Sequence, residues 1–88
     1  MNIEFTHRFE DETDEISEPK LRERIKSIIE AVRDASTPRQ IPHLKKLKGY
    51  RDFYRIRIAD FRIGIRIKGD TVIFAAFGSR KDIYRSFP

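Results

Sequence analysis

Basic side chains recur at alternate positions between residues 53 and 68, and they are the residues best suited to chemistry. Guanidinium groups match phosphate oxygens through two parallel hydrogen bonds and keep their charge throughout the physiological pH range. The only acidic residue in this stretch is Asp60. The pattern therefore predicts a surface that binds an anion such as a phosphate backbone. The residues that would form it are Arg55, Arg57, Arg62, Arg66 and Lys68.

Alternation also predicts where these side chains point, because successive residues of a strand face opposite sides of a sheet. If residues 59–60 form the tip of a hairpin, every apolar pair falls on one face and every arginine on the other. Arg57 then lies opposite Arg62, and their repulsion favours a bound anion. Gly64 would leave a gap for the backbone of a ligand. The alternatives are a polar face covered by water and, because alanine disfavours positive φ, a longer loop at the tip.

An aromatic residue near these arginines suggests a second kind of contact. Gly69-Asp70 is a typical two-residue hairpin turn, and residues 72–77 form the strand that follows it. In a regular register Phe77 lies beside Arg62 on the basic face, where an exposed ring would stack on a base. The alternative is that the C-terminal segment covers this ring.

The elements that must hold this face are one strand and two helices. Residues 2–6 alternate like a short strand, and residues 8–16 are expected to form a short helix. Residues 18–35 carry an apolar stripe at three- and four-residue steps, which predicts an amphipathic helix with Pro19 in its first turn and Ser17 as cap. The expected fold is α+β, with the strand and both helices packed on one face of a small antiparallel sheet that ends in a three-stranded meander.

Composition limits the number of domains and the classes of site that the chain can contain. The 88 residues suit one domain, 1–88, and the absence of cysteine excludes disulfides and thiolate metal sites. Residues 1–36 hold six Lys/Arg against ten Asp/Glu, whereas residues 37–88 hold thirteen against four, so the basic charge is concentrated in the second half. No signal peptide or membrane-spanning run is recognised, and we expect a soluble cytosolic protein. No Gly-rich phosphate loop or metal-ligand spacing is present, so no cofactor and no metal are expected.

Two segments carry a resemblance to a known family. The run LKKLKGYRDFYRIRIADFRIGIRI, a Gly-Asp hairpin, and the terminal FGSRKDIYRSFP are similar to the RelE/ParE superfamily of bacterial type II toxin–antitoxin toxins, over roughly residues 40–88. RelE-type members cut messenger RNA in the ribosomal A site, and ParE-type members poison DNA gyrase on the same fold. The resemblance implies a RelE-like, metal-independent endoribonuclease. The alternatives are a ParE-like gyrase inhibitor and an inactive binding protein.

The resemblance also implies residue roles. In RelE-like chemistry a ribose 2′-OH attacks the adjacent phosphate, which requires proton transfer and cations for the developing charge. Arg62 and Arg80 would stabilise the transition state, and Tyr84 is the candidate for proton transfer, with plain packing as its alternative. Substrate phosphates and bases would be held by the remaining basic and aromatic positions, Arg55, Arg57, Arg66, Lys68, Phe77 and Lys81.

Two positions depart from the family pattern. Relatives often have lysine at Arg55 and Arg57, and many have histidine at Ser79. Arginine cannot act as a general base, so these departures leave Tyr84 as the acid–base candidate. His43 is the other titratable candidate, and we interpret it as taking no part in catalysis. The partners implied by the resemblance are a cognate antitoxin, with a toxin–antitoxin heterotetramer as one assembly, and the ribosome with its mRNA.

Overall fold

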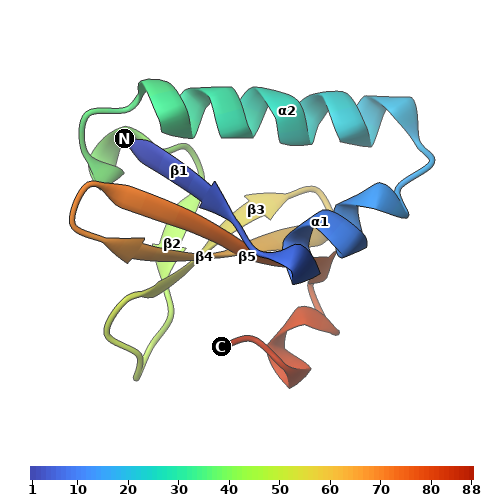
Figure 1. Cartoon of the computed structure of the whole chain (residues 1–88). Coiled ribbons are helices and arrows are strands. Elements are labelled where there is room, and N and C mark those ends of the chain that lie inside the picture. The colour runs from blue at the N-terminus through green and yellow to red at the C-terminus, as the bar shows by residue number, and fades with distance from the viewer.

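The chain folds as an α+β structure in the computed structural model, which describes all of residues 1–88. Two α-helices precede most of the strands, and two short 3-10 helices lie in the second half (Figure 1). The elements are β1 (Asn2–Phe5), α1 (His7–Asp14), α2 (Pro19–Asp34), η1 (Pro38–Gln40), β2 (Leu44–Lys46), β3 (Phe53–Ile58), β4 (Phe61–Lys68), β5 (Thr71–Ser79) and η2 (Ile83–Arg85). None of the helices is both long and apolar enough to span a membrane.

The five strands form one sheet in the order β1-β5-β4-β3-β2. The meander β3-β4-β5 is antiparallel as predicted, but β1 pairs with β5 in parallel, so the expectation of a wholly antiparallel sheet was wrong. A parallel pair needs a long connection, and here both α-helices and β2 to β4 lie between its two strands. β2 was also not predicted. It is three residues long and adds the edge strand beside β3.

The register of the first hairpin is confirmed. Arg57 pairs with Arg62, Arg55 with Gly64, and the isoleucines of both strands share the opposite face. The tip is the two-residue turn, in which Ala59 has a φ of 52° despite the steric cost of that conformation for alanine.

The second hairpin contains a bulge that the sequence pattern does not reveal. Ile65 pairs with Phe74 but Gly64 pairs with Ala76, so Ala75 is an extra residue in β5. Beyond this point each side chain of β5 faces the side opposite to the one a regular strand would give. Phe77 therefore points into the core, where it is 7% exposed and its ring stacks 5.2 Å from that of Phe61. The prediction of Phe77 on the basic face was wrong, and so was its alternative.

α2 covers one face of the sheet along its length (Figure 1). Its apolar stripe, Leu21, Ile25, Ile28 and Val32, is buried with the inward isoleucines of β3 and β4 in a cluster of 15 buried residues. α1 adds Phe9, which packs on Phe74 with ring centres 5.4 Å apart. Ser17 does not cap α2. The N-cap residue is Glu18, without a side-chain hydrogen bond.

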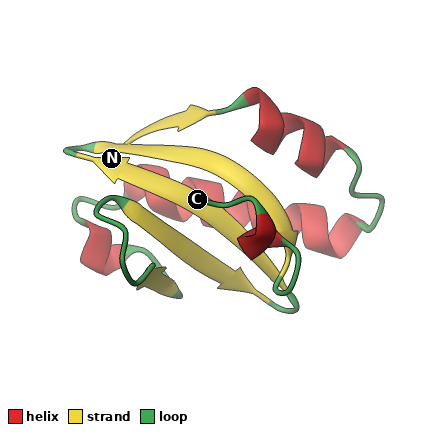
Figure 2. Cartoon of the chain, turned by 90° about the horizontal axis from the view of Figure 1, so that it is seen from below, coloured by secondary structure: helices red, strands yellow, loops and turns green.

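The C-terminal segment covers part of the opposite face (Figure 2). Ala76, Ile83 and Phe87 form a small separate core with Leu47, Phe53 and Ala75 at its margin. The ring of Phe87 occupies the space in front of Gly64, where an added Cβ would lie 2.6 Å from ring carbons. The predicted gap at Gly64 is therefore real but is filled by the chain itself.

Candidate functional site

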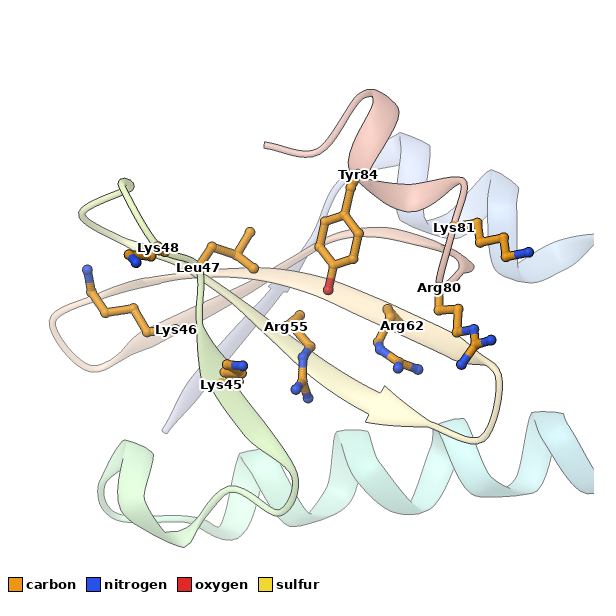
Figure 3. A pocket seen from close by; sticks show the side chains of 9 residues that line it. All are labelled: Lys45, Lys46, Leu47, Lys48, Arg55, Arg62, Arg80, Lys81 and Tyr84. Atoms are coloured by element: carbon orange, nitrogen blue, oxygen red, sulfur yellow. The ribbon is translucent and has the colours of Figure 1, made fainter.

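A cationic groove lies between the sheet, the segment after β2 and the C-terminal turn (Figure 3). Its volume is about 580 Å³, and no acidic residue lines it. Seven of its nine lining residues are basic, and Leu47 and Tyr84 complete it. We call it the basic groove; its basic residues are Lys45, Lys46, Lys48, Arg55, Arg62, Arg80 and Lys81. Because assembled like charges repel, the groove favours an anion that relieves the repulsion.

Arg62 is held by the hairpin from which it projects. Its Nη1 donates to the carbonyl of Ala59 at 3.1 Å and to that of Phe61 at 2.8 Å, so the guanidinium is fixed while Nε and Nη2 remain available. Arg55 is held similarly, since its Nη1 donates to the carbonyl of His43 at 3.1 Å. Two partly fixed guanidinium groups thus lie in the groove before any ligand arrives, which lowers the entropy cost of binding.

Arg80 and Tyr84 reach the groove from the C-terminal segment. The Arg80 N–H donates to the carbonyl of Asp60 at 2.9 Å, which places Arg80 next to the tip of the first hairpin. Tyr84 lies on η2 between two anchors, Ile83 and Phe87, that are 2% and 5% exposed. Its own side chain is 46% exposed, and its hydroxyl points into the groove toward Arg55 and Arg62 (Figure 3).

The C-terminal turn is tied to α1 by a short chain of polar contacts. Arg8 donates to the carbonyl and the hydroxyl of Ser86 at 3.1 and 2.7 Å, and its Nε donates to Glu12 at 3.2 Å. Glu12 also accepts the N–H of Phe77 at 3.0 Å, next to the bulge. One carboxylate therefore supports both the irregular part of β5 and the arginine that holds the turn. The sequence pattern gave no sign of either role.

Five of the predicted site residues come together in the groove. They are Arg55, Arg62, Arg80, Lys81 and Tyr84. The other four do not line it. Arg57 lies on β3 just past the start of β2 and lines two other hollows, Lys68 lies at the far end of β4 beside the Gly69 turn, and Phe77 is in the core.

Arg66 forms an ion pair within the chain and does not line the groove. Its Nη2 lies 3.7 Å from a carboxylate oxygen of Asp52, and its guanidinium lies over the ring of Phe53 at 5.5 Å. These two contacts hold Arg66 beside Asp52 and Phe53, away from the residues that line the groove.

Three lysines of the groove were not predicted as site residues. Lys45, Lys46 and Lys48 come from β2 and the turn after it, and Lys45 pairs with Arg55 across the β2–β3 ladder. The signal was present in the run Leu44-Lys45-Lys46-Leu47-Lys48, which precedes the arginine strands. It was missed because a three-residue edge strand leaves little periodicity to read.

The chain resembles known toxins in both sequence and fold. A family model described as the ParE toxin of the type II toxin–antitoxin system parDE matches residues 3–84. Toxin RelE3 of Methanocaldococcus jannaschii is 45% identical over 69 residues, which make up 77% of this chain and 78% of that protein.

Two solved complexes resemble the fold. The structure of a RelB–RelE antitoxin–toxin complex from Methanococcus jannaschii superposes with a TM-score of 0.81 at 38% identity, over 97% of this chain and 99% of the matched one. An archaeal RelE–RelB complex from Pyrococcus horikoshii OT3 superposes with a TM-score of 0.74 at 15% identity, over 92% and 96% of the two chains. At that identity the second likeness concerns the fold alone.

Proposed function

The chain belongs to the RelE/ParE superfamily of toxins, and from that premise we propose that it cleaves messenger RNA on the ribosome. The observation that carries the proposal is the convergence of Arg55, Arg62 and Arg80 with the hydroxyl of Tyr84 in one groove without an acid (Figure 3). A phosphodiester is the anion that this set of groups fits, since it offers oxygens to the guanidinium groups and a leaving oxygen to protonate.

The reaction would proceed by attack of a ribose 2′-oxygen on the adjacent phosphorus. The 2′-OH proton is removed, the bond from phosphorus to the 5′-oxygen breaks, and that oxygen takes up a proton. The products are a 2′,3′-cyclic phosphate and a free 5′-OH. Arg62 and Arg80 would stabilise the charge on the pentacoordinate phosphate, and Arg55 would hold the strand. Tyr84 would carry one of the two proton transfers, and the groove lysines are candidates for the other.

The test is cleavage of an mRNA on programmed ribosomes, with the ends of the fragments analysed chemically. Arg62→Ala and Arg80→Ala should each slow cleavage by about two orders of magnitude, the usual cost of losing a group that stabilises developing charge. Arg39→Ala serves as the matched control, because Arg39 is exposed on η1 and lies outside the groove. Parent-like cleavage by both groove variants, or products without cyclic phosphate ends, would contradict the proposed chemistry.

Inhibition of DNA gyrase is the second candidate, favoured by the match of residues 3–84 to the ParE family model. A supercoiling assay with purified protein separates the two functions. We expect gyrase activity to be unchanged at concentrations that cleave ribosome-bound mRNA. Inhibition of supercoiling without mRNA cleavage would support the ParE-like alternative.

We also propose a cognate antitoxin as the physiological partner, because two of the structures that resemble this fold are RelB–RelE complexes. An acidic segment of the antitoxin would neutralise the seven cations of the basic groove. Purification from cells that express the native operon should yield a complex, and light scattering would show whether it contains two copies of each chain. A toxin that purifies alone from such cells would contradict this part of the proposal.

A further inference from the structure

Basic side chains continue beyond the groove, around the β2–β3 edge of the sheet. A second hollow of about 280 Å³ is lined by His43, Leu44, Lys45, Arg55 and Arg57, and it shares Lys45 and Arg55 with the basic groove. A third, of about 290 Å³, lies against α2 and shares His43 and Arg57 with the second. The three hollows therefore form one path, and no acidic residue lines any of them.

The far end of this path is shaped by one flank of α2. Arg24 supplies a cation there, while Ser27 and Ala31 are small and leave room beside the helix. The acidic residues Glu23 and Glu30 line a different hollow, on the flank of α2 that faces α1. Neither Arg24 nor Arg57 forms an ion pair within the chain, whereas Arg8, Arg33, Arg66 and Arg85 do. Arg24 and Arg57 are thus free to bind an external anion.

His43 lines both of the smaller hollows. Its carbonyl accepts the Nη1 of Arg55 at 3.1 Å and the backbone N–H of Arg57 at 3.3 Å. Its φ is 58°, in the left-handed region that few residues other than glycine adopt. His43 is exposed and lines both smaller hollows together with Arg57, so its imidazole can stack on a base or bond to a phosphate.

We propose that the path binds the strand that flanks the cleaved phosphodiester, with Arg57, His43 and Arg24 forming a second RNA subsite outside the basic groove. Arg55 and Arg57 are two residues apart on β3, or about 7 Å, which is comparable to the step between successive phosphates of an extended strand. A chain of cations that runs around the sheet edge suits such a strand better than a compact anion. This inference rests on the proposed ribonuclease function and extends its substrate beyond the scissile step.

The test compares two RNA oligomers of three and nine nucleotides that carry 2′-O-methyl groups and are therefore not cleaved. Binding to the purified protein is followed by fluorescence anisotropy at low salt. The nine-nucleotide oligomer should bind more tightly to the parent, and this gain should fall about fivefold in Arg24→Ala and in Arg57→Ala. Each of these variants should also lower the dependence of log Kd on log salt by about one. Lys26→Ala, which removes an exposed cation from the other flank of α2, should keep the gain.

Three results would overturn the inference while leaving the proposed function intact, provided that the parent still cleaves mRNA on ribosomes. The first is a parent that gains no affinity with length, and the second is a gain that both arginine variants retain. The third is that the arginine variants keep the gain in RNA affinity but bind empty ribosomes or the antitoxin more weakly. That result would assign the path to one of those partners. Thermal melting of each variant checks the fold, and both side chains are exposed.

Discussion

The two faces of the sheet are covered very differently. On one face α1 and α2 close over a cluster of 15 buried residues, and on the other the C-terminal segment covers a cluster of only three. The thick cover carries most of the buried apolar surface and hence most of the hydrophobic stabilisation. The thin cover carries Tyr84 and Arg80 to the basic groove. Stability and the proposed chemistry are therefore supported by different sets of contacts.

The largest effect on stability is expected on the thick side. Phe74→Ala removes a ring that is 0% exposed and packs against Phe5 and Phe9, with ring centres 5.3 and 5.4 Å away. The free energy of unfolding should fall by about 3–5 kcal/mol, the usual cost of such a cavity. Urea unfolding measures it. A loss below 1 kcal/mol would mean that the helical core is less important than its burial indicates.

Phe87→Ala tests the C-terminal segment, because it removes the main anchor of that thin cover. We expect a smaller loss, about 1–2 kcal/mol, since the C-terminal turn can detach without unfolding the sheet. Cleavage should fall about 100-fold, because Tyr84 loses its position. Gly64→Ala attacks the same contact from the sheet side, where its Cβ would clash with the Phe87 ring. If both substitutions disrupt the same contact, the double variant should cleave mRNA no more slowly than the slower single variant. Additive losses would show that Gly64 and Phe87 act independently.

The smallest effect is expected at Arg8, which ties the turn to α1. Arg8→Ala removes the bonds to Ser86 and to Glu12, and the side chains of this ion pair are 39% and 33% exposed. The unfolding free energy should change by about 1 kcal/mol or less, with a cleavage rate reduced severalfold. Arg22→Ala is a useful comparison, since Arg22 also bonds to backbone carbonyls, at the α1–α2 connection. A cleavage loss equal in both variants would argue against a specific role for Arg8.

Much of the basic groove was predictable because its strands are neighbours in sequence. The register that places Arg57 opposite Arg62 followed from side-chain alternation and a two-residue turn, and both are local properties. The amphipathic stripe of α2 was predictable for the same reason.

The remaining features depend on contacts between distant residues. No residue near Gly64 in sequence indicates that Phe87 fills the space in front of it. Likewise, no residue pattern around Arg66 indicates that it forms an ion pair with Asp52. The prediction for Phe77 was wrong because the extra residue in β5 is stabilised from the start of α1. There the hydroxyl of the N-cap residue Thr6 donates to the Ala75 carbonyl at 2.9 Å. Periodicity within one strand cannot report support that comes from another element.

The extra residue at Ala75 reverses the alternation of side chains in the second part of β5. Phe74 and Phe77 are three positions apart yet lie on the same side, and the residues after the bulge keep that shifted phase to the end of the strand. Deleting Ala75 would restore the regular period and exchange the sides of residues 76–79, so that Phe77 would lie beside Arg62 among the cations. A one-residue gap at this point of an alignment would therefore mark a relative in which the aromatic ring at this position has moved from the interior to the basic face.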